Sequence, residues 1–124
     1  STAAGRVFAA WMPKKVVTPL IAEELKSAKL PPELKSRTAV EALLSEIRAQ
    51  GYAATNGQHK VAGVEAVAAP VFNFKNEITM SVLVVGVQGM LDISPEGEVI
   101  KSLKRHAETL SLRLGAHGEP KLPA

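Results

Sequence analysis

The sequence predicts an α+β fold, in which helices cover an antiparallel sheet. Two long apolar runs, residues 64–72 and 78–87, have the length and the Val-rich composition of strands. Only a short polar segment, Asn73 to Asn76, separates them, which is typical of a hairpin, and Asn tolerates the left-handed conformation that such turns need. Amphipathic helical patterns precede and follow this pair, and the order of helices, strands and helix indicates helices on one face of the sheet.

Two helical segments open the chain. The first, from Ala3 to Trp11, has apolar residues at helical spacing and ends before Pro13, which disfavours helix at the residue preceding it. The second spans residues 14–29 and contains Pro19, which must kink or restart it. Its apolar side consists of Val17, Leu20, Ile21 and Leu25.

The clearest helix begins at a capping box, Thr38 to Glu41. In this motif the Thr hydroxyl accepts from the third amide and the Glu side chain reaches back to the cap amide. Gly51 lies where a left-handed residue ends a helix. The spacing i, i+3, i+4, i+7 predicts one buried stripe, formed by Val40, Leu43, Leu44 and Ile47.

The last helix is expected to begin at Ser94 as N-cap, with Pro95 in the first position and Glu96 in the first turn. Gly115 ends it, and residues 115–124 are expected to form a flexible tail. The predicted buried side consists of Val99, Leu103, Ala107, Leu110 and Leu114.

The first strand of the hairpin is apolar at nearly every position, which predicts burial on both faces. Pro70 cannot donate to a ladder, so the strand must bend or be at an edge there. The pattern leaves the register of the hairpin open, and with it the face that Ala66 shares with Leu83. Two or three strands make a thin sheet, which indicates further strands elsewhere.

Composition excludes several classes of function. With 124 residues the chain forms one domain or part of one. Cysteine is absent, which excludes disulfides, thiol catalysis and thiolate zinc sites. The net charge of +3 comes from scattered basic residues, and this permits contact with nucleic acid without indicating it. No apolar run is long enough to span a membrane and no signal segment opens the chain, so a cytoplasmic location is expected.

No motif of an enzyme, a metal site or a cofactor site is present. His59, His106 and His117 lack the spacing of metal ligands. Ser81 lies within a strand and outside any Gly-x-Ser-x-Gly elbow. We therefore expect no catalytic residues, no metal and no cofactor, and a protein that is not an enzyme.

Four separated motifs carry a family resemblance. They are Ser-Thr-Ala-Ala-Gly-Arg at residues 1–6, Arg-Ala-Gln-Gly-Tyr-Ala at 48–53, the strand from Gly63 to Phe72, and Ser-Leu-Arg-Leu-Gly at 111–115. In order and spacing they resemble the effector-binding domain of IclR-type bacterial transcription regulators. Each motif is weak alone, but the set covers nearly the whole chain.

The resemblance implies a place in a larger protein. In this family an N-terminal winged helix-turn-helix reads the operator, and a profilin-like or GAF-like domain binds a small effector. The family's effector domain has strands and a helix before the first motif, so residues 1–124 resemble its C-terminal two-thirds, incomplete at the N-terminus. The resemblance further implies a homo-oligomer, dimer or tetramer, that contacts DNA only through the missing helix-turn-helix.

The resemblance also implies an effector pocket. The backbone amides of Ala3 and Ala4 correspond to those that hold an effector carboxylate, as suits the start of a helix. The other wall positions are Asn56, Val64, Ala66, Leu83 and Val85. Family members that bind small oxo-acids have an acid, hydroxyls or a thiol there, whereas this chain has an amide and aliphatic groups. A larger, apolar or aromatic effector, with room for one carboxylate at the amides, is therefore expected.

Two other functions remain open from the sequence. One is a ligand-free oligomerisation module, in which Leu83 and Val85 simply fill the core, and the other is a small enzyme. A cavity lined by Ala66, Leu83 and Val85 would favour a sensor, and solid packing there would favour the module.

Overall fold

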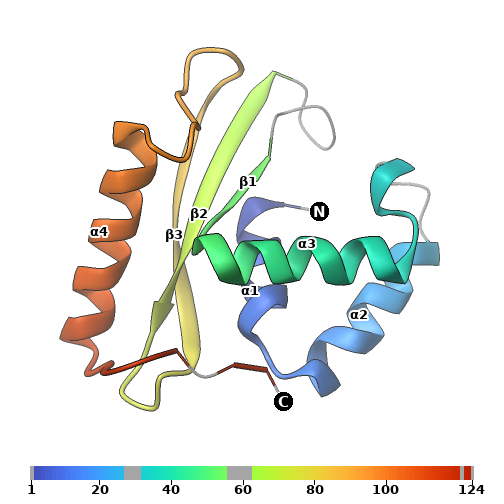
Figure 1. Cartoon of the computed structure of the whole chain (residues 1–124), viewed down its shortest axis with the longest axis horizontal. Coiled ribbons are helices and arrows are strands. Elements are labelled where there is room, and N and C mark those ends of the chain that lie inside the picture. The colour runs from blue at the N-terminus through green and yellow to red at the C-terminus, as the bar shows by residue number, and fades with distance from the viewer. Residues whose placement is uncertain (1, 27–31, 56–62, 121, 124) are drawn as a thin grey trace.

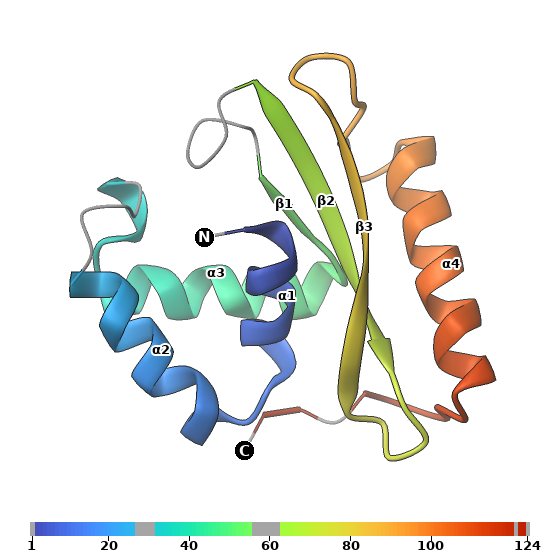
Figure 2. The same cartoon turned by 180° about the vertical axis from the view of Figure 1, so that it is seen from behind.

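A three-stranded antiparallel sheet lies between two helical layers (Figures 1 and 2). The computed structural model describes residues 2–26, 32–55, 63–120, 122 and 123. The strands are β1 (Ala53–Thr55), β2 (Val64–Phe72) and β3 (Ile78–Val87), with β2 in the centre. The helices are α1 (Ala3–Trp11), α2 (Lys14–Lys26), the short 3₁₀ helix η1 (Pro32–Leu34), α3 (Arg37–Gln50) and α4 (Glu98–Arg113).

The α+β prediction with an antiparallel sheet is confirmed, but the expectation that helices cover one face is wrong. Helices α1 and α3 pack against one face of the sheet, with α2 beside them, and α4 packs against the other face. The physical reason lies in β2, because its side chains alternate between the two faces and both sets are apolar except for Glu65. Burying both sets requires a helical layer on each side.

The hairpin between β2 and β3 sets which residues share a face. Ala66 lies opposite Val85 and Ala68 opposite Leu83, so these four side chains belong to the face that α1 covers. Phe72 pairs with Ile78 beyond a register shift that follows Val71. The turn contains Asn76 in the left-handed region with φ 59°, as expected from the sequence.

Pro70 lies where β2 has a free edge. β1 pairs with β2 only as far as Ala68. The amide of Phe72 donates to Ser111 Oγ at 3.0 Å, on the side of β2 away from β3. Since backbone direction alternates with period two, the nitrogen of Pro70 faces the same side, beyond the end of β1. The proline therefore costs no ladder hydrogen bond, which confirms the edge prediction.

The start of α3 differs from the predicted capping box. The N-cap is Ser36, whose hydroxyl oxygen accepts from the amide of Ala39 at 3.1 Å. Thr38 and Glu41 therefore lie inside the helix, because Ser36 offers the same cap two residues earlier. The other end agrees with the sequence, since Gly51 is left-handed with φ 86°.

The start of α4 also differs from the prediction. Gly97 is the N-cap and makes no side-chain cap bond. Ser94 belongs instead to the preceding turn, where its hydroxyl donates to Asp92 Oδ1 at 2.7 Å and its carbonyl accepts from the Gly97 amide at 3.0 Å. The expected end at Gly115 is confirmed by its φ of 90°.

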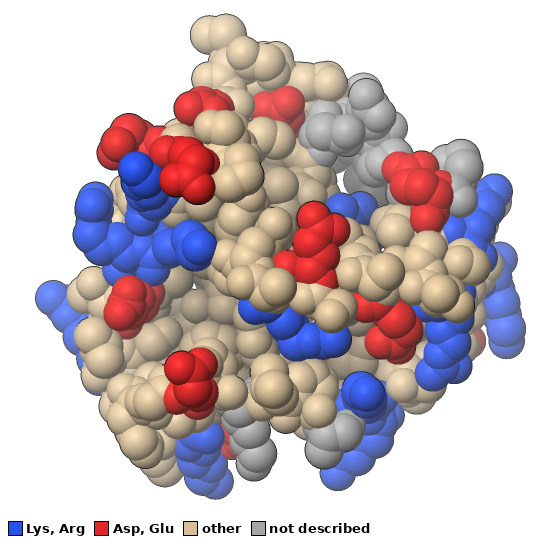
Figure 3. Space-filling model, in the orientation of Figure 1, with Lys and Arg blue, Asp and Glu red and all other residues tan. Residues whose placement is uncertain are grey.

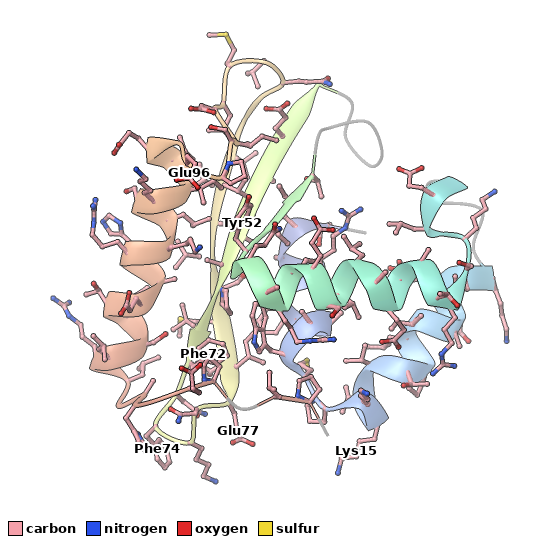
Figure 4. The ribbon with its side chains drawn as sticks, viewed as in Figure 1. Lys15, Tyr52, Phe72, Phe74, Glu77 and Glu96 are labelled. Atoms are coloured by element: carbon pink, nitrogen blue, oxygen red, sulfur yellow. The ribbon has the colours of Figure 1, made fainter. Side chains whose placement is uncertain are left out.

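Two apolar cores fill the spaces between the layers. The core under α1 and α3 contains Phe72, whose ring meets Trp11 edge to face at 5.9 Å. The core under α4 contains Tyr52, and Figure 4 labels this residue and Phe72, one aromatic from each core. The buried side of α4 consists of Ile100, Leu103, Ala107 and Ser111.

The predicted sets of buried residues are therefore partly wrong for two helices, α4 and α2. In α4 only Leu103 and Ala107 are in both the predicted and the observed set, because the helix is rotated so that Ile100 faces the sheet. In α2 the helix continues through Pro19, and Leu20 is 59% exposed. Val17 and Ile21 are the buried residues of α2.

The Ser36 cap makes a direct prediction about stability. Replacing Ser36 with Ala should lower the free energy of unfolding by about 1 kcal/mol, because it removes the side-chain acceptor of the first turn. The matched control is Thr38→Ala, which should change the unfolding free energy by less than about 0.5 kcal/mol. Urea denaturation of both variants measures these changes. A larger loss of unfolding free energy for Thr38→Ala than for Ser36→Ala would support the predicted capping box at Thr38 instead.

Ser111 is predicted to secure the free edge of β2. Its hydroxyl accepts from Phe72 and donates to the Ala107 carbonyl at 2.9 Å. Ser111→Ala leaves the buried Phe72 amide without an acceptor, so it should destabilise the fold by about 1–3 kcal/mol. The half-buried Ser102 on the same helix supplies the control Ser102→Ala. Equal melting temperatures for the two variants would contradict this role.

Candidate functional site

The strand residues that the sequence singled out share one face of the sheet. Val64, Ala66, Leu83 and Val85 all lie on the side that α1 covers, and Ala66 is directly opposite Val85. Ala66 packs against the core that contains Ala3 of α1. The first turn of α1, which contains Ala3 and Ala4, thus lies on the same face of the sheet as these four strand positions, and we call these six residues the sheet site. Asn56 lies outside the described residues.

The first turn of α1 leaves two backbone donors for a ligand. Thr2 is the N-cap, and its hydroxyl oxygen accepts from the Gly5 amide at 3.0 Å while its carbonyl accepts from the Arg6 amide at 2.9 Å. In the described part of the chain the amides of Ala3 and Ala4 meet no acceptor. Two free amides at the positive end of a helix dipole form a favourable place for a carboxylate.

The strand side of the sheet site is apolar and open. Leu83 is 48% exposed and Val85 is 57% exposed, because β3 is the last strand of the sheet. The four best-defined cavities among the described residues are not lined by any residue of the sheet site. Among the described residues, the cavities given above therefore do not include one at the sheet site, and the exposed Leu83 and Val85 are not solidly packed either.

The outer edge of β3 has unpaired backbone groups. The amide of Gln88 donates to the carbonyl of Gly63 at 2.8 Å, which places even-numbered β3 amides toward β2. The amides of Ser81, Leu83 and Val85 therefore point away from β2. In the described sheet no strand lies on that side.

Arg6 has a role beside the site that the sequence did not indicate. Its guanidinium Nη1 donates to the carbonyl of Ala54 in β1 at 3.4 Å, which ties α1 to the sheet. Burial lowers the pKa of the Arg6 guanidinium, and the nearby carboxylates of Glu33 and Glu24 act in the opposite direction. The only signal in the sequence was the position of Arg6 at the end of the first motif.

Other chemistries receive no support from the described residues. They contain no group of three or more His, Cys, Asp or Glu side chains that could hold a metal ion. No helix within them is long and apolar enough to cross a membrane. Basic and acidic side chains are interspersed over the face shown in Figure 3, so this face has no continuous basic surface for nucleic acid.

Comparison with known proteins gives consistent results. The family model described as "Bacterial transcriptional regulator IclR C-terminal" matches residues 1–112. The HTH-type transcriptional regulator RhmR of Escherichia coli is 34% identical over 84 residues, which are 68% of this chain and 32% of RhmR. The crystal structure of Pseudomonas aeruginosa HmgR is similar with a TM-score of 0.81 and 32% identity, covering 95% of this chain and 45% of HmgR.

The lengths of these proteins differ from that of the chain. The chain spans less than half the length of the relatives that it matches. The solved C-terminal domain of the Escherichia coli regulator KdgR is closer in size. It has 25% identity and a TM-score of 0.72, and the match covers 94% of this chain and 70% of that domain.

Proposed function

The chain belongs to the IclR family of bacterial transcription regulators, within their C-terminal domain, and we propose that it carries the effector-binding site of such a regulator. The family and the relatives are transcription regulators rather than enzymes. The observation that carries the proposal is the pair of amides at Ala3 and Ala4, which have no acceptor among the described residues and lie on the sheet face that carries the apolar strand positions. An anionic head and an apolar body are thereby recognised by neighbouring groups.

The proposed effector is an apolar or aromatic acid. Its carboxylate accepts from the amides of Ala3 and Ala4, and its body packs on Ala66, Leu83 and Val85. These side chains offer no hydrogen bonds, so each polar group of a small oxo-acid left unpaired against them would cost about 1–3 kcal/mol. An aromatic ring has no polar group that would be left unpaired there, and it covers the exposed parts of Leu83 and Val85.

We further propose that the chain is the C-terminal two-thirds of one effector domain, whose preceding strands pair with the outer edge of β3. The 70% share of the KdgR domain supports this size. The exposed apolar side chains of β3 support the location.

In the proposed mechanism the effector acts through assembly. The regulator is a cytoplasmic homo-oligomer, dimer or tetramer, and reads DNA through an N-terminal winged helix-turn-helix. The effector binds one arrangement of subunits more tightly than the other, and that arrangement spaces the DNA-binding heads differently. The required difference in affinity is about 1–3 kcal/mol for a typical allosteric coupling.

A second candidate is a ligand-free oligomerisation module. The exposed row of Leu83, Val85 and Val87 favours it, since another subunit could cover these side chains. The two candidates differ in what happens when that row is altered. The sensor loses its effector, whereas the module loses its partner subunit.

Calorimetry on the regulator that contains this chain tests the effector class. We expect phenylacetate to bind more tightly than pyruvate or glyoxylate, because only the aromatic acid offers an apolar body to the strands. Ala3→Pro, which removes one amide at a position where proline suits the helix, should weaken phenylacetate binding by about tenfold. Tight binding of pyruvate or glyoxylate without binding of aromatic acids would contradict the proposed class.

Leu83→Asp tests the location of the site. A carboxylate in the apolar wall should weaken the effector response by at least about tenfold and leave operator affinity largely intact. The matched control is Met80→Asp, on the same strand and similarly exposed, whose side chain lies on the opposite face with that of Val71. An unchanged effector response in Leu83→Asp would contradict the sheet site as the place where the effector binds. Loss of the oligomer in this variant would instead favour the oligomerisation module.

A further inference from the structure

A cavity of about 440 Å³ is lined by residues of α1, α2 and α3. Figure 2 shows these three helices together on one side of the sheet. We call this cavity the helical cavity. It contains none of the residues of the sheet site. Its lining includes the side chains of Phe8, Ala9, Met12, Val17, Ile21 and Leu44. The family resemblance assigned no function to this place.

The lining of the helical cavity is mostly apolar, although it also includes Thr2, Arg6, Glu23 and Glu24. The volume of the cavity lies within the range of about 300–1,000 Å³ that small-molecule sites have. Along the apolar part of this lining, water finds few hydrogen-bond partners. The lining atoms of an empty cavity lose the contacts that a filled site would give them, which favours entry of an apolar molecule.

The charged groups at the mouth select against anions. Arg6, Glu23 and Glu24 are the charged residues that line the cavity. Glu24 and Glu33 interact electrostatically with Arg6, so its charge is already compensated by neighbouring carboxylates. Two carboxylates against one guanidinium leave a mouth with a net negative charge, which repels a carboxylate ligand. The negative charge at this mouth is thus opposite in sign to the partial positive charge of the amide pair in the sheet site.

Helix α2 forms the outer wall, and its attachment permits entry. Val17 and Ile21 are its buried residues, whereas Val16 and Leu20 are 39% and 59% exposed. Pro19 removes one hydrogen bond of the helix and weakens it in the middle. A wall held by few side chains can move by the small distance that a ligand needs.

From this lining, volume and charge we propose that the helical cavity is a second binding site, which takes a small uncharged aromatic or aliphatic molecule. The site is separate from the effector site proposed above and does not depend on it. A ligand there fixes α2 against α1 and α3, and so stabilises the layer that holds the first turn of α1.

Toluene titrated into the 124-residue chain is a direct test, with methyl NMR as the readout. We expect saturable shifts of the Met12, Val17 and Leu44 methyl groups, and no shift of Leu83 or Val85. The half-buried Ala9 lines the cavity, so Ala9→Leu should fill it and weaken toluene binding at least tenfold. The matched control Ala22→Leu, at an exposed position of α2, should leave the affinity unchanged.

Four outcomes would overturn the proposal. The first is the absence of saturable shifts up to the solubility of toluene, and the second is shifts confined to the sheet site. The third is benzoate binding at the same methyl groups as tightly as toluene, which would contradict selection for a neutral ligand. Val40→Phe fills the cavity from α3 and replaces Ala9→Leu if that variant does not fold. Unchanged toluene affinity in the folded filling variant also excludes this site.

Discussion

The antiparallel ladder between β2 and β3 is the interaction on which the rest of the structure depends. Its nine residue pairs set β2 between two apolar layers and give each layer one set of alternating side chains. The same register places Ala66 and Leu83 on the face of α1. A slip by one residue would move every β3 side chain to the other face, so that Leu83 and Val85 would no longer share a face with Ala66. The candidate site is therefore a consequence of pairing rather than of any single side chain.

The two strands of this ladder differ in how far they are buried and paired. β2 is buried on both faces and paired on both sides as far as Ala68, whereas β3 has one partner and exposes Leu83 and Val85. Exposed apolar side chains beside unpaired amides are costly in an isolated strand and favour pairing with more protein. We infer that the proposed effector domain continues at the open edge of β3. The same continuation would wall off the apolar side of the sheet site.

Features that depend on local backbone chemistry could be predicted from the sequence. The strands, the left-handed Gly51 and Asn76 and the free edge at Pro70 follow from residues close to each other. Features that depend on distant contacts could not. The rotation of α4 toward Ile100 is set by the sheet beneath it, and the helical cavity exists only where three helices meet. The predicted cap of α3 was wrong for another reason, because both Ser36 and Thr38 satisfy the local pattern of an N-cap. For the site, the residue types came from a resemblance, and the register that joins them came from the structure.

Hydrogen exchange at the outer amides of β3 tests the central claim most directly. Amide exchange of Ser81, Leu83 and Val85 is compared by NMR between the 124-residue chain and the longer regulator that contains it. We expect fast exchange in the chain alone and protection by orders of magnitude in the longer protein, because a further strand pairs with these amides. The amides of Val82 and Val84, which face β2, serve as the internal reference and stay protected in both. Equally fast exchange of the three outer amides in the longer protein would contradict the claim that the sheet continues past β3.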